Sequence, residues 1–294
     1  MKKGLFVILA IAATVISVNA QNIIDAEDGH NPNDFYQQGL VVGKKAMPYP
    51  YLRESDVVWK TTIWRAIDMN ETFNQYMYFP QDNERNTQGR INLVNLIVTT
   101  AANGDFDVYE DDDMKIPQEW DKARANLAGQ QVIRVDTGEE DEDGNPIYVD
   151  STAPGEPDFE SFKKVMLKEY WYIDKQDTRQ KVRIVGLCFI FDKMTYQAGT
   201  EVPLSGQKSF WVPMNEMNVR QVLVNANAYE ASNDVAERSY DDIFIQRYFD
   251  SYITRESNVY NRSIDDYLTG EDAILRSQAI ENQIFDIESD MWEY

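Results

Sequence analysis

The residues of this chain whose types and spacing could bind a metal are concentrated in one acidic segment. Glu139, Asp141, Asp143 and Asp150 occupy the first, third, fifth and twelfth positions of a calcium-binding loop pattern, with Gly144 at the sixth. Two features depart from that pattern. Its first ligand would be Glu instead of Asp, and its flanking residues predict strands instead of helices. A charged hairpin tip is therefore the default interpretation, and a calcium site is the alternative.

No set of residues predicts a catalytic centre. Cys188 is the only cysteine and His30 the only histidine, which excludes a zinc site of Cys and His ligands. Cys188 lies in the apolar segment 185–191, which is typical of a buried and unreactive thiol. The carboxylates are too numerous for one acid–base pair to stand out. We therefore predict no catalytic residues and no cofactor, and a hydrolase with another kind of site stays open as an alternative.

Hydrophobic periodicity and turn residues predict a mixture of helices and strands. The expected helices span 57–67, 91–102, 117–127, 215–225, 241–254 and 273–292. The expected strands span 76–79, 105–109, 131–135, 147–150, 168–174 and 181–191, with another extended piece ending at Pro213. The order lacks a regular alternation of strand and helix, so we predict an α+β fold of mixed helices and short antiparallel strands.

The domain organisation follows from shifts in composition. We expect a signal peptide at 1–20, an extended acidic and polar arm at 21–55, and an N-terminal α+β lobe at 56–150. Pro154, Gly155 and Pro157 mark a linker at 151–160, and a C-terminal α+β lobe would fill 161–294.

The first twenty residues have the pattern of an export signal. Lys2 and Lys3 precede an apolar run over 5–18, and small residues lead to a cleavage site between Ala20 and Gln21. Because Gln21 is not a cysteine, the mature chain gains no lipid there. No later segment has about 18 uncharged apolar residues in a row, so we expect an exported chain without a membrane span.

The charge and the aromatic content favour protein partners. Fifty acidic residues oppose 28 basic ones, and the net charge of −22 disfavours nucleic acid and anionic membranes as partners. Six tryptophans and 17 tyrosines exceed what a core easily holds. We expect a partner interface at Trp211, Met214 and Met217, and an arm, 22–51, that orders on a partner.

Several stretches of the chain resemble the gliding-motility protein GldN family, also called PorN. They include Asp56–Lys60 and Ile63–Asp68, Glu169–Gln176 and Val182–Cys188, and then Trp211–Asn215, Arg220–Val224, Ala231–Ala236 and Tyr240–Phe244. These stretches follow one another in order over roughly residues 56–265, which makes the resemblance more specific than any single motif.

The resemblance implies a non-enzymatic component of the type IX secretion system. Such a protein would lie in the periplasm at the inner face of the outer membrane, in a ring with the lipoprotein GldK/PorK and with copies of itself. It would also contact the periplasmic shaft protein GldM/PorM. The alternative is a periplasmic calcium- or carbohydrate-binding module that uses the acidic loops and exposed aromatic side chains.

Overall fold

The computed structural model describes residues 44–81, 89–127, 130–140, 146–154, 158–176, 179–197, 200–230, 233 and 237–292. The chain divides into two units, 1–44 and 45–294, and every helix and strand described belongs to the second. The expected signal peptide, with Ala20 and Gln21, lies outside the described residues, as does the arm up to residue 43.

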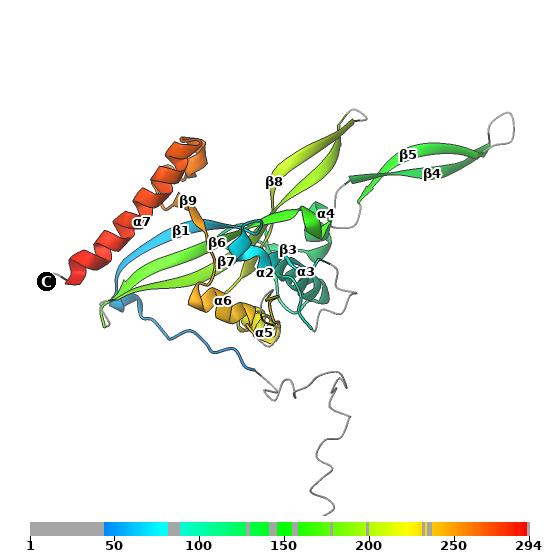
Figure 1. Cartoon of the computed structure of the whole chain (residues 1–294). Coiled ribbons are helices and arrows are strands. Elements are labelled where there is room, and N and C mark those ends of the chain that lie inside the picture. The colour runs from blue at the N-terminus through cyan, green and yellow to red at the C-terminus, as the bar shows by residue number, and fades with distance from the viewer. Residues whose placement is uncertain are drawn as a thin grey trace, which may run out of the picture. The chain divides into compact units, whose positions relative to one another are not determined.

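A seven-stranded antiparallel sheet is the frame on which the other elements pack (Figure 1). Its strand order is β3-β2-β8-β7-β6-β1-β9. The bounds are β1 Val57–Asp68, β2 Val108–Tyr109, β3 Pro117–Gln118, β6 Phe162–Asp174, β7 Gln180–Gln197, β8 Thr200–Pro213 and β9 Tyr252–Glu256. β6, β7 and β8 are consecutive antiparallel neighbours, which confirms the pairing expected of 168–174 with 181–191. The sheet takes strands from both sides of residues 151–160, because β1 pairs with β6.

Two further strands form a separate hairpin. β4, Gln130–Glu140, pairs antiparallel with β5, Pro146–Pro154, in a two-stranded sheet of their own. This confirms the hairpin expected from the two strand-like segments on either side of Asp143 and Gly144.

The helices are α2 Gln75–Tyr78, α3 Leu93–Asn103, α4 Trp120–Leu127, α5 Met217–Asn225, α6 Tyr240–Gln246 and α7 Glu271–Trp292. Local signals explain their ends. α3 starts where the side chain of Asn92 accepts a hydrogen bond from the Asn95 N–H at 2.7 Å, and it ends at Gly104, whose φ is 79°. The helices expected near 91–102, 117–127, 215–225 and 273–292 are confirmed, and the α+β class is the observed one.

The prediction of a helix over 57–67 was wrong, because this segment is strand β1. Trp59, Ile63 and Ile67 recur every four residues, and that spacing places side chains on one face of a helix. The same even spacing also places them on one face of a strand. The β-branched residues favour the strand, and β1 gains neighbours on both sides, β6 along its length and β9 over Ile63–Ala66.

Two other predictions were wrong in type or extent. Tyr76–Phe79 was expected as a strand but lies in and after the short helix α2, where the Phe79 N–H donates to the Gln75 carbonyl at 3.0 Å. The helix expected over 241–254 ends early. Arg247 takes the left-handed conformation, with φ of 53°, and the chain then forms the edge strand β9.

The buried apolar side chains form three clusters. The main cluster joins the inner residues of β6, β7 and β8 to α3, α5 and α6. The α7 cluster consists of Ile63, Ile253, Ile264, Ile280 and Ile284, and it holds α7 beside the β1–β9 edge of the sheet (Figure 1). The tryptophan cluster consists of Trp64, Cys188 and Trp211. In the part of the chain that is described, no helix has the length and apolar character needed to cross a membrane.

Candidate functional site

A buried charged network lies where the main cluster meets the α7 cluster. On β1, Arg65 stands between Ile63 of the α7 cluster and Ile67 of the main cluster, on the same face of the strand. Glu169 has the matching place on β6, between Leu167 and Trp171. The alternation of side chains along the two strands therefore places opposite charges together in the interior.

The carboxylate of Glu169, which has no exposed surface, is the centre of this network. Arg247 donates to its Oε1 at 2.6 Å, Trp171 Nε1 donates to Oε2 at 2.8 Å, and Arg65 Nε lies 3.5 Å from Oε2. Arg65 also pairs with Glu281 of α7 at 2.5 Å. Because these partners use both carboxylate oxygens, the network joins β1, β6 and α7 to Arg247, the residue that follows α6.

The acidic turn at 110–113 covers part of one face of the sheet, the face that carries the tryptophan cluster. Asp111 accepts hydrogen bonds from the backbone N–H groups of Ile116 at 2.8 Å and Lys115 at 2.9 Å. The hydrogen bond from the Ile116 N–H is the main reason why the pKa of Asp111 lies below its usual value. This carboxylate therefore closes the turn.

The next two carboxylates of the turn pair with cations. Asp113 accepts from Lys115 at 2.8 Å and from the buried Lys168 at 2.7 Å, and these hydrogen bonds lower its pKa to about 2. Asp112 pairs with Arg255 at 2.5 Å, and the Arg255 guanidinium lies 3.4 Å from the ring centre of Trp64. The described residues contain no group of three or more His, Cys, Asp or Glu arranged to hold a metal ion.

The four calcium candidates are only partly within the described residues. Glu139 lies in β4 and Asp150 in β5, where Asp150 stands opposite Arg134 in the strand register. Asp141 and Asp143 lie outside the described residues. The calcium hypothesis therefore stays a prediction.

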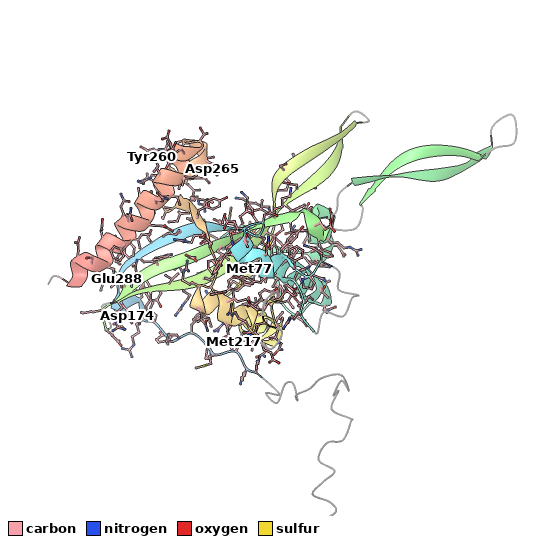
Figure 2. The ribbon with its side chains drawn as sticks, viewed as in Figure 1. Met77, Asp174, Met217, Tyr260, Asp265 and Glu288 are labelled. Carbon is pink, nitrogen blue, oxygen red and sulfur yellow. The ribbon has the colours of Figure 1, made fainter. Side chains whose placement is uncertain are left out.

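The structure separates the three residues expected at a partner interface. Trp211 is 4% exposed and Met214 2% exposed, whereas Met217 is 39% exposed. Trp211 packs in the tryptophan cluster and Met214 in the main cluster, because the end of β8 is covered on both faces. Of the three, only Met217 offers surface to a partner in this conformation, and Figure 2 labels it on the ribbon near α5.

The last part of the arm packs against the chain's own body. Arg220 of α5, which is 1% exposed, pairs with Asp241 at 2.9 Å and donates to the carbonyl oxygen of Met47. Its guanidinium lies 4.4 Å from the ring centre of Tyr49, and that of Arg183 lies 4.9 Å from the same ring. The expectation that residues up to 51 order only on a partner is therefore corrected for 46–51.

This packing leaves an exposed surface, which we name the methionine surface and define as Met47 and Met217. Met217 begins α5 one turn before Arg220, and Arg220 binds the carbonyl of Met47. Unbranched methionine side chains adapt to irregular partners and are common on protein-binding surfaces. That a partner binds the methionine surface stays a prediction.

Sequence reasoning missed a second surface, the aromatic pocket, formed by Phe73, Tyr76, Phe79, Tyr229 and Tyr248. These residues come from three segments, and 150 positions separate Phe79 from Tyr229, so no local motif could unite them. The one available signal is the concentration of aromatic residues in 73–79, part of which, 76–79, the sequence predicts as a strand.

Comparison with known proteins gives one clear result. The family model described as gliding motility associated protein GldN matches residues 52–293. The match therefore runs from the end of the arm through α7 and includes the central sheet and the β4–β5 hairpin. No curated protein matches the chain.

Proposed function

The chain belongs to the GldN family of gliding motility-associated proteins, and from this premise we propose that it is a periplasmic, non-enzymatic subunit of the type IX secretion and gliding machinery. In this proposal it forms a ring with a GldK/PorK-like lipoprotein at the inner face of the outer membrane. It also contacts a GldM/PorM-like shaft protein. The family is one of gliding motility components and is not a known enzyme family.

The family match across 52–293 is the observation that carries the proposal. The distribution of side chains supports it. The buried charges of Arg65 and Glu169, with the partly exposed Arg247, hold elements together, while the methionine surface and the aromatic pocket leave apolar side chains exposed. Exposed apolar patches of this kind mark protein-binding sites in soluble proteins.

A ring requires that one surface of each subunit bind a different surface of its neighbour. The chain has two candidate surfaces in separate places, one formed by α5 with residues 46–51 and one formed by α2 with the residues that follow α5 and α6. Two distinct surfaces suit simultaneous contact with two kinds of partner, such as the lipoprotein and the shaft protein.

Size-exclusion chromatography with light scattering tests the proposal. The mature chain, starting at Gln21, is mixed at micromolar concentration with the GldK/PorK-like lipoprotein produced without its lipid. We expect an assembly containing many copies of both proteins. A mixture that contains only the two separate monomers contradicts the proposed function.

Paired variants then test the methionine surface. Met47→Ala combined with Met217→Ala removes two exposed side chains, and we expect it to weaken the assembly by tenfold or more, as a loss of about 1.4 kcal/mol would. Val259→Ala is the matched control, because Val259 is also exposed but lies outside both surfaces. Equal assembly by the double variant and the control would exclude the methionine surface from the contact.

A further inference from the structure

We propose that the aromatic pocket is a docking site for a segment of a partner protein that carries one large apolar side chain flanked by lysine or arginine. The inference adds a specific site and a specific ligand chemistry to the proposed function. It does not depend on that function, because it is argued from the pocket alone.

The walls of the pocket leave aromatic side chains exposed in a hollow. Phe73, Phe79, Tyr229 and Tyr248 are each between 37% and 47% exposed, and they surround a cavity of about 480 Å³. Cavities of roughly 300–1,000 Å³ lined by aromatic side chains are typical binding pockets. This volume exceeds that of a single large apolar side chain, so the pocket can receive one together with part of its backbone.

The segments that carry Phe73 and Tyr248 are tied together by a buried amide. Asn74 is fully buried, and its side chain donates to the carbonyls of Asp68 at 2.9 Å and Asp250 at 3.0 Å. Its Oδ1 accepts from the Asp250 N–H at 2.9 Å. These bonds tie the 3-10 turn Thr72–Asn74 to the segment that follows α6. A partner therefore meets a preformed pocket and loses little free energy in ordering it.

The aromatic rings of the pocket pack against one another, which holds them in place. Phe73 and Tyr248 have ring centres 4.9 Å apart with an interplanar angle of 49°, and Tyr76 and Tyr248 have centres 6.0 Å apart. The Tyr76 hydroxyl donates to the backbone carbonyl of Tyr248, so its polar end is already satisfied inside the chain. The ring surfaces that remain are apolar faces and edges.

An excess of negative charge lies beside the pocket, next to its lining residue Thr72. Glu71 lies near Asp68 and Asp250, and burial, followed by these two carboxylates, raises the pKa of Glu71. Asp68 lies 3.9 Å from Lys164, whereas no ion pair is found for Glu71 or Asp250 among the described residues. Cationic groups on either side of an inserted side chain would relieve this repulsion.

The cations already at the pocket do not cancel this excess. Arg238 lies over the ring of Tyr248, 4.0 Å from its centre, and 3.6 Å from Glu230. Both members of this pair are partly exposed, so the pair contributes little stability and can rearrange. A second copy of this chain is a poor occupant, because each copy carries a net charge of −22. A basic segment of another protein is the complementary occupant.

Peptide binding measured by nuclear magnetic resonance tests the inference. The probe is the tripeptide acetyl-Lys-Phe-Lys-amide, titrated into the mature chain. The ring signals of Tyr229 and Tyr248 are assigned from their Phe variants. We expect these signals to shift, and we expect acetyl-Glu-Phe-Glu-amide and acetyl-Lys-Ala-Lys-amide to bind at least tenfold more weakly. Equal shifts with the acidic or the alanine peptide would overturn the proposal.

Single substitutions test whether the peptide binds in the aromatic pocket. Phe73→Ala should weaken binding of acetyl-Lys-Phe-Lys-amide about tenfold, as the loss of an aromatic contact at a binding hot spot does. The matched control is Phe285→Ala, because Phe285 is an exposed phenylalanine on α7, outside the pocket. Should Phe73→Ala fail to fold, Phe79→Ala and Glu71→Gln serve instead. Unchanged binding by folded pocket variants contradicts the inference, whether or not the chain assembles with the lipoprotein.

Discussion

The main cluster and the α7 cluster show two ways in which this chain holds its elements together. In the described part of the chain, the main cluster contains 31 buried residues, and the α7 cluster contains five, all of them isoleucine. A 22-residue helix therefore depends on few apolar contacts. A region that has fewer buried apolar contacts to break needs less free energy to open. We therefore infer that α7 opens more easily than the sheet.

At the boundary between the main cluster and the α7 cluster, charged side chains add to the few apolar contacts of α7. Arg65 contacts Glu169 on the sheet side and Glu281 on the α7 side, so one guanidinium belongs to both regions. The comparison teaches that α7 is attached mainly by a few isoleucines, by the buried hydrogen bond from the Ile253 N–H to Ser277, and by two partly exposed ion pairs, Arg65–Glu281 and Arg276–Glu256. The main cluster, in contrast, joins β6, β7 and β8 to α3, α5 and α6 in one apolar interior.

The largest effect is expected for Glu169→Ala. Its removal leaves the guanidiniums of Arg65 and Arg247 near each other without the carboxylate that balances them. Removing one partner of a buried ion pair costs about 3–5 kcal/mol. Urea unfolding monitored by tryptophan fluorescence measures this change. A loss below about 1 kcal/mol would show that the network contributes little.

Leu167→Ala tests the main cluster and should cost about 2–5 kcal/mol. Cys188 provides a chemical readout. Burial raises the pKa of its thiol to about 12, so the folded chain should react very slowly with iodoacetamide near pH 8. We expect Leu167→Ala to speed this labelling in proportion to the unfolded fraction. Labelling as slow as in the unchanged chain would contradict a single shared interior.

Ile280→Ala tests the α7 cluster and should have a smaller, local effect. We expect faster amide hydrogen exchange over residues 271–292, because the isoleucine that anchors the helix is lost. Labelling of Cys188 should stay as slow as in the unchanged chain. If both α7 exchange and Cys188 labelling rose together, α7 and the sheet would open as one unit and the comparison would fail.

Glu281→Gln should have the smallest effect. The Glu281 side chain is about half exposed, so its pairing with Arg65 is worth under about 1 kcal/mol. We expect slightly faster hydrogen exchange in α7 and no change in the urea midpoint. Exchange rates equal to those of Ile280→Ala would show that the ion pair, and not the isoleucines, attaches the helix.

The sequence predicted the elements whose signals are local. α3 has a capping Asn92 and a terminal Gly104, and the β6–β7 pair has two apolar runs around a polar turn, so both were recognised. β1 was not, because a spacing of four residues is shared by one face of a helix and one face of a strand. Only the neighbouring strands β6 and β9, distant in sequence, decide between the two.

The candidate surfaces were less predictable than the fold. Trp211 and Met214 were expected at an interface from residue type alone, but burial depends on which elements cover both faces of β8. The aromatic pocket joins α2 with residues that follow α5 and α6, and only the folded chain brings them together. The chemistry of a side chain can be read from the sequence, whereas its exposure requires the structure.

The most direct test of the proposed assembly is the size of the complex that contains this chain in the cell envelope. Envelopes with and without the GldK/PorK-like lipoprotein are extracted in mild detergent and separated by native mass. The proposal predicts that the chain migrates in a ring-sized complex together with the lipoprotein and that this complex disappears when the lipoprotein is deleted. A chain that migrates as a monomer in both envelopes would contradict it.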